Sequence, residues 1–148
     1  MIRQENLILT FAGGDQNFFR NPTFWVWVNS VKMIPNTDVV ILTHQMTEDV
    51  RDRLSDSKIE VVDVTPGELH SLYRDRHLCF WEYLNDHGHK YKYVVVCDCR
   101  DVVFQASPFD WAEKWKSRHV GIGGCKNFLG DFVILVAEGH KMSQSGFA

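Results

Sequence analysis

Two carboxylates and a guanidinium lie within four consecutive residues, at Asp98, Arg100 and Asp101, directly after the apolar run Tyr93–Cys97. Two carboxylates so close together repel each other and favour a hard divalent cation. Mg²⁺ or Mn²⁺ held by one or two carboxylates completes its coordination with water and substrate phosphates. The residues therefore indicate a metal site for a diphosphate ligand. They also fit a solvated turn in which Arg100 pairs with Asp98 or Asp101.

The stretch from Tyr93 to Phe109, YVVVCDCRDVVFQASPF, resembles a segment of the GT-A glycosyltransferases. In that segment a hydrophobic strand ends in an acidic DxD-type motif, and a short hydrophobic strand and a Pro-Phe turn follow. The chain is most similar to the D-x-R-D-V-V-F-Q form, in which Asp98 matches the first acid and Asp101 the last. A plain DxD motif would have its second acid at position 100, where this chain has Arg100.

The resemblance implies a metal-dependent glycosyltransferase, or its donor-binding fragment, that uses a nucleotide-diphosphosugar of the UDP or GDP type. It implies Mn²⁺ or Mg²⁺ bound by Asp98 and Asp101, with Arg100 close to the diphosphate. The acceptor and the catalytic residues stay unassigned. The alternative is a non-catalytic α/β binding or interaction module that keeps the fold and uses the two acids only structurally.

Two further segments are candidates for nucleotide binding. The first is Phe11-Ala12-Gly13-Gly14-Asp15, where the GT-A fold usually holds the nucleoside; its glycines allow close backbone approach and Asp15 can accept from a ribose hydroxyl or base. The same segment also fits a flexible strand-to-helix turn. The second is Arg76, near the nucleotide in comparable enzymes, or else a surface charge paired with Asp75 or Glu82.

Four apolar runs of strand length must position these residues. Because the runs do not alternate with polar residues, they predict strands covered on both faces, as in a parallel sheet. The runs are Leu7–Phe11, Val39–Leu42, Ile59–Val64 and Tyr93–Cys97. We expect the third strand on one side of the sheet and the strand ending at Cys97 near its centre.

Helical patterns separate these strands. One helix begins at Asn21-Pro22 and buries Phe24, Trp27, Val28 and Val31, and another begins at Thr47 and buries Val50 and Leu54. A longer one runs from Pro66 to about His87 and ends at Gly88. The prediction is a three-layer α/β fold with a mostly parallel, doubly wound sheet, and the resemblance adds a GT-A-like identity.

The last part of the chain has a different pattern. We expect a short helix over 110–118, a glycine-rich stretch to residue 130 and a fifth strand over 132–137, with Glu138 as a candidate late acid. We interpret residues 1–148 as a single GT-A-like domain, with a nucleotide-binding half at 1–118 and an incomplete acceptor-side segment at 119–148. The incomplete sheet edge would favour self-association.

Composition excludes several classes of partner. The formal net charge of −3 argues against binding to nucleic acid. No apolar run is long enough for a membrane segment and no secretory signal is recognisable, so we expect a cytoplasmic protein. Cys97-x-Cys99 lacks the spacing and the second pair of thiolates that a structural zinc site needs.

Overall fold

The core of the fold is a five-stranded sheet with the order β3-β2-β1-β4-β5, in which all neighbouring strands are parallel. The computed structural model describes residues 4–13, 16–65, 72–115 and 133–137. The strands are β1 (Asn6–Gly13), β2 (Thr37–His44), β3 (Ile59–Asp63), β4 (Tyr93–Cys97) and β5 (Val133–Ala137). The prediction of a parallel sheet is confirmed: the third strand lies at one edge, and the strand ending at Cys97 lies beside β1, which is the central strand.

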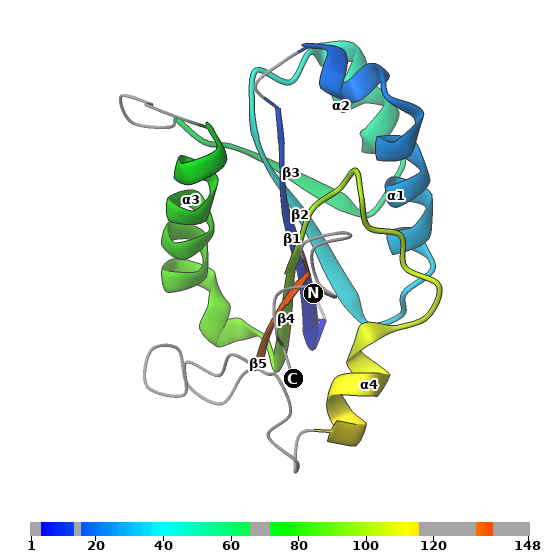
Figure 1. The fold of residues 1–148 in the computed structure, drawn as a ribbon, viewed down its shortest axis with the longest axis vertical. Coiled ribbons are helices and arrows are strands. Elements are labelled where there is room, and N and C mark those ends of the chain that lie inside the picture. The colour runs from blue at the N-terminus through cyan, green and yellow to red at the C-terminus, as the bar shows by residue number, and fades with distance from the viewer. Residues whose placement is uncertain (1–3, 14–15, 66–71, 116–132, 138–148) are drawn as a thin grey trace.

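Helices cover both faces of the sheet (Figure 1). On one face lie α1 (Pro22–Lys32), α2 (Glu48–Ser55) and α4 (Pro108–Trp115), and on the other lies α3 (Leu72–His87). Two short 3₁₀ turns, η1 (Gln16–Arg20) and η2 (Gly88–Lys90), precede α1 and follow α3. Each face has its own buried apolar cluster, so the predicted three-layer α/β architecture is confirmed. None of the described helices combines the length and apolar character needed to cross a membrane.

The N-terminal signal of α1 acts as its sequence predicts, whereas Thr47 stands at the N-cap position of α2 but its side chain makes no capping hydrogen bond and donates to the Asp49 carboxylate instead. The Asn21 Oδ1 atom accepts a hydrogen bond from the Thr23 backbone N–H at 3.0 Å, which satisfies one of the free donors of the first turn. Pro22 occupies the first turn of α1, where no donor is lost. The residues buried by the two helices are those that the spacing predicts: Phe24, Trp27, Val28 and Val31 in α1, and Val50 and Leu54 in α2.

The later helices follow the prediction with shifted boundaries. The helix α3 ends at His87, before Gly88, as expected, while residues 66–71 of the predicted helix lie outside the described residues. The helix α4 begins at Pro108, two residues earlier than position 110. The fifth strand is confirmed over Val133–Ala137. The end of the predicted 110–118 helix, the glycine-rich stretch and Glu138 lie outside the described residues.

The segment after the acidic motif differs from what the resemblance implies. No strand forms over 98–107, and Pro108-Phe109 begins α4 instead of making a turn. The segment packs Val102 and Phe104 against the α1 side of the core. The backbone N–H of Phe104 donates to the Ser30 Oγ atom of α1 at 3.2 Å. The expected short strand is therefore wrong, because the segment bonds to a helix side chain where a strand would bond to a neighbouring strand.

Candidate functional site

The candidate site lies at the carboxyl edge of the sheet, where β1 and β4 end side by side. Their paired positions run from Asn6↔Tyr93 to Leu9↔Val96. Beyond the ladder, the Thr10 Oγ1 atom donates to the Cys97 carbonyl at 2.7 Å, and the Cys99 Sγ atom donates to the Phe11 carbonyl at 3.5 Å. These two bonds fix the backbone on either side of Asp98.

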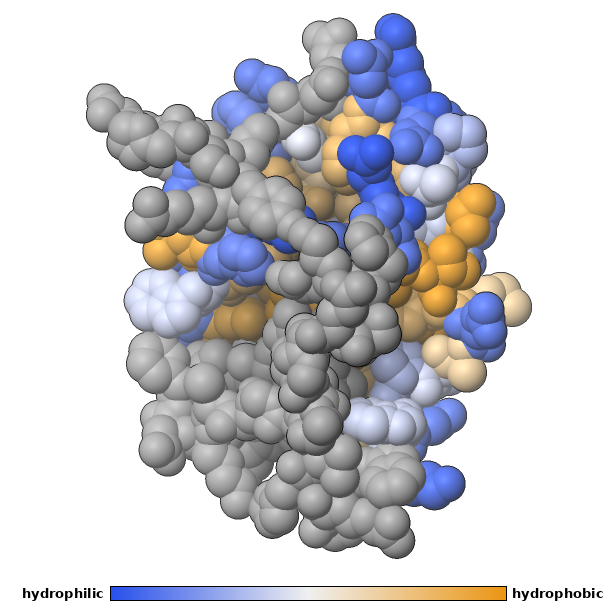
Figure 2. Space-filling model, in the orientation of Figure 1, coloured by the Kyte–Doolittle hydropathy of each residue, from blue (hydrophilic) through white to orange (hydrophobic). Residues whose placement is uncertain are grey.

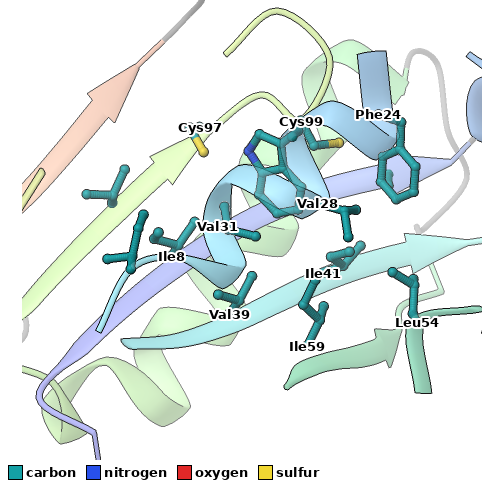
Figure 3. Packing of buried hydrophobic residues seen from close by; sticks show 14 of the residues in the cluster. Ile8, Phe24, Val28, Val31, Val39, Ile41, Leu54, Ile59, Cys97 and Cys99 are labelled. Atoms are coloured by element: carbon teal, nitrogen blue, oxygen red, sulfur yellow. The ribbon is translucent and has the colours of Figure 1, made fainter. Parts of the chain in front are cut away.

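Asp98 points away from the side to which its two chain neighbours point. Cys97 and Cys99 are both buried in the cluster on the α1 side, where Figure 3 labels them together with Val28 and Val31. Asp98, the residue between them, is directed to the α3 side, although β4 ends at Cys97 and the chain bends from Cys99. Its partner comes from α3, since the Arg76 Nη1 atom lies 2.7 Å from the Asp98 Oδ1 atom.

The ion pair between Arg76 and Asp98 is the principal charged contact of the site. The two side chains are 16% and 30% exposed, so the pair is partly screened from water. Asp98 thus pairs with an arginine 22 residues earlier in the chain. The alternative from the sequence, a pair between Asp98 and Arg100, does not form. The contact ties the first turns of α3 to the end of β4.

Arg100 and Asp101 lie on the surface of the same loop. Both side chains are exposed. The Arg100 guanidinium lies over the ring of Phe18 in η1, 5.2 Å from the ring centroid. Asp101 takes part in none of the ion pairs found among the described residues. The loop therefore offers solvent one carboxylate and one guanidinium beside the half-buried Asp98.

The predicted nucleoside segment at the end of β1 is largely occupied by protein contacts. Phe11 packs partly buried on the α3 side, and Ala12 is buried on the α1 side. The Ala12 carbonyl accepts from the Thr43 hydroxyl at 2.6 Å. Gly13 has a φ of +143°, and a Cβ atom there would come within 2.3 Å of the His44 carbonyl oxygen. The close approach that Gly13 permits is thus to the β2 backbone; Gly14 and Asp15 lie outside the described residues.

The oxygen donors of the loop suit a hard cation that binds together with substrate oxygens. Among the described residues, no three His, Cys, Asp or Glu side chains gather closely enough to hold a metal ion alone. Asp98 and Asp101 supply two carboxylates with access to solvent, and Mg²⁺ or Mn²⁺ commonly takes one or two carboxylates and fills its shell with water and phosphate. The two carboxylates therefore suit a metal ion only if oxygen atoms of the bound substrate complete its coordination.

The neighbouring thiols suit a metal less well. Burial raises the pKa of the Cys99 thiol to about 12, and it also raises the pKa of Cys97. Both thiols are therefore protonated at neutral pH, whereas metal coordination requires the thiolate. Cys79, Cys97 and Cys99 are free and buried, and Cys125 lies outside the described residues.

Sequence reasoning missed the hydroxyl groups that hold the site together. Thr10 and Thr43 are fully buried, and each bonds the carbonyl of a neighbouring strand. Ser30 anchors the loop after Asp101. The signal for the threonines was a single hydroxyl near the carboxyl end of an otherwise apolar run, while Ser30 had no distinguishing signal because its partner is far away in the sequence.

Comparisons of the chain with family models, curated proteins and solved structures found no match.

Proposed function

We propose that this chain binds a nucleotide-diphosphosugar of the UDP or GDP type as the donor domain of a metal-dependent glycosyltransferase. The observation that carries the proposal is the location of Asp98, directly after β4 at the carboxyl edge of a parallel sheet, with Asp101 on the same loop. Ligands of open parallel α/β sheets bind outside the carboxyl ends of the strands. The D-x-R-D-V-V-F-Q resemblance supplies the ligand class.

In this proposal the acids would bind the metal ion, and the arginines would orient Asp98 or contact the diphosphate. Asp98 and Asp101 would bind Mn²⁺ or Mg²⁺, which supplies Lewis-acid stabilisation of charge on a leaving diphosphate. Arg76 holds one oxygen of Asp98 and restricts the carboxylate to one orientation. The exposed guanidinium of Arg100 is a donor of the kind that binds phosphate oxygens. Arg76 is thus a positioning residue for Asp98.

A second function is favoured by the same ion pair. Because Arg76 already neutralises Asp98, the carboxylate has a structural role that requires no metal. A non-catalytic α/β binding or interaction module would retain this contact, and its Asp101 would be a solvated surface acid. The two functions differ in whether nucleotide binding depends on a divalent cation.

Calorimetric titration with UDP and GDP separates the two functions. We expect binding with Mn²⁺ or Mg²⁺ present and loss of binding with EDTA. Asp98→Asn and Asp101→Asn should each weaken binding by about 1–3 kcal/mol, the range for losing a charged partner. Asp86→Asn, which removes an exposed acid on α3, is the charge-matched control and should leave the affinity unchanged.

Two results would contradict the metal-site proposal. Nucleotide binding that survives EDTA and both substitutions would favour the non-catalytic module. An equal loss in Asp86→Asn would show that the effect reflects net charge and not the loop.

A further inference from the structure

A groove lies between α1 and α2, on the face of the sheet opposite α3. Its volume is about 540 Å³, within the range of about 300–1,000 Å³ that small-molecule sites occupy. Trp25 and Val26 supply its more exposed apolar lining, and Arg20, Arg53 and Asp49 its charges. Figure 2 shows apolar and strongly hydrophilic surface side by side on the part of the molecule where α1 and α2 lie in Figure 1. The groove thus combines an apolar wall with ionic groups.

Arg53 is held in one orientation within this groove. Its guanidinium carbon lies 3.6 Å from the centroid of the Trp25 ring, which is the geometry of a stacked cation–π contact. The indole is itself fixed, because its Nε1–H donates to the Phe19 carbonyl at 2.8 Å. Stacking uses the face of the guanidinium and leaves the N–H groups at its edge, which suits paired hydrogen bonds to a carboxylate or phosphate.

The charges that line the groove favour an anion. The lining of the groove includes two guanidinium groups, from Arg20 and Arg53, and one carboxylate, from Asp49. Asp49 accepts a hydrogen bond from the Thr47 hydroxyl, which lowers its pKa and keeps it ionised at neutral pH. None of the ion pairs among the described residues includes Arg20 or Arg53, whereas the neighbouring Arg51 pairs with Glu48 and Asp63.

We propose that this groove binds a small organic anion that carries an apolar ring. The carboxylate or phosphate of the ligand is held by Arg53 and Arg20, and its ring lies against Trp25 and Val26, since Val26 is 49% exposed. The site is separate from the candidate donor site, because it uses neither Asp98 nor Asp101 and requires no metal ion. The two sites are nevertheless close in the fold: the rings of Phe19 and Phe18 are 5.3 Å apart, and Phe18 carries the guanidinium of Arg100.

Titration with simple probes, in buffer that contains EDTA, tests the ligand chemistry. Phenyl phosphate and phenylacetate should both bind, and the tighter of the two identifies the preferred anion. Inorganic phosphate, which lacks the ring, and benzyl alcohol, which lacks the charge, should each bind at least about tenfold more weakly. The affinity of the anionic probes should fall as salt is raised. Failure of both ring-bearing anions to bind would overturn the proposal.

Substitutions on one helix test the location. Arg53→Met should weaken binding of the anionic probes by about tenfold, and Arg53→Lys by less, because the lysine keeps the charge and loses the planar pair of donors. Arg51→Met removes the same charge from α2 outside the groove and should leave binding unchanged. If Arg53→Met lowers the thermal unfolding midpoint, probe binding to Arg20→Gln provides a second test of the location. Equal losses in Arg51→Met and Arg53→Met would overturn the assignment.

The outcome is independent of the proposed donor function. Asp98→Asn should leave phenyl phosphate binding unchanged, and Arg53→Met should leave metal-dependent UDP binding unchanged. A groove that binds the probes while UDP binding fails would support the anion site alone, and the converse result would support only the donor site. Probe binding that Asp98→Asn abolishes would place the anion at the motif loop and overturn the groove proposal.

Discussion

The contact between Arg76 and Asp98 has energetic consequences that follow from its partial burial. Exposed ion pairs contribute about 0–1 kcal/mol, whereas removing one partner of a fully buried pair costs about 3–5 kcal/mol. With side chains 16% and 30% exposed, this pair lies between those limits. The carboxylate is thus oriented but still reachable from solvent, which is what a group that binds a ligand requires.

Replacing Arg76 by methionine tests whether the pair with Asp98 both stabilises the fold and orients the carboxylate. We expect Arg76→Met to lower the free energy of unfolding by about 1–2 kcal/mol, because Asp98 stays half-buried without its partner. Metal-dependent UDP binding should weaken as well, because the carboxylate loses its fixed orientation. Urea unfolding and calorimetry measure the two effects.

The exposed pair Lys92–Glu113 provides the control for this substitution. Its atoms are 3.1 Å apart, but its side chains are 46% and 45% exposed. Lys92→Met should therefore change stability by less than about 0.5 kcal/mol. If Arg76→Met and Lys92→Met had the same small effect, the Arg76–Asp98 pair would be no more than a surface contact.

The acids of the motif were visible in the sequence, but the partner of Asp98 was not. Local alternatives were nearer in the chain: Asp75 and Glu82 for Arg76, and Arg100 for Asp98. What decides the pairing is that Cys97 and Cys99 are both drawn into the core on the α1 side, which turns Asp98 towards α3. That preference depends on the whole layer of side chains and cannot be read from four residues.

Among the elements, the strands were the most predictable because a strand buried on both faces needs an uninterrupted apolar run. The strand β4 has the predicted bounds, Tyr93–Cys97. The strands β1 and β2 extend further, to Gly13 and His44, because small residues at the end of β1 and polar residues at the end of β2 join the ladder without a strong apolar signal. The run Val102–Phe104 carries the same signal and forms no strand, because it packs against α1.

Ser30 connects α1 to the loop that follows Asp101, and a substitution at Ser30 tests this connection. Its Oγ atom donates to the Trp27 carbonyl at 2.7 Å and accepts from the Phe104 N–H at 3.2 Å, which fastens the motif loop to α1. Ser30→Ala should lower the free energy of unfolding by about 1 kcal/mol, the usual value of one hydrogen bond. It should also speed amide hydrogen exchange at Phe104.

Ser55 is a matched control, because its hydroxyl makes the same type of bond, to the Asp52 carbonyl in α2. Ser55→Ala should leave exchange at Phe104 unchanged. An exchange rate at Phe104 that is the same in Ser30→Ala and in the unsubstituted protein would show that packing alone holds the loop.

At the scale of the whole molecule, groups that are neutral when protonated are buried on both faces of the sheet. Cys97 and Cys99 lie in the cluster on the α1 side, and Cys79 lies in the cluster on the α3 side, which Tyr83 and Tyr91 also contact. Burial is the largest cause of a raised pKa in all five groups. Ionisation of each of these groups at high pH therefore favours the unfolded chain.

The expected result is a protein that loses stability in alkali over a defined range of pH. The thiol of Cys99 has an ordinary pKa of 9.0 and a folded pKa of about 12, and Tyr83 is raised from 10.0 to about 12. Between these values the unfolded chain has lost protons that the folded chain keeps, so the unfolded state binds fewer protons and the free energy of unfolding falls as pH rises. Below about pH 9 both states are protonated, so these groups do not make the free energy of unfolding depend on pH.

Urea unfolding from pH 8 to pH 11 should show a decline in the free energy of unfolding on the order of several kcal/mol that begins near pH 9. Cys99→Ala removes one of the titrating groups and should make the decline shallower, whereas an equally steep decline in this variant would show that Cys99 ionises as readily in the folded chain as in the unfolded one.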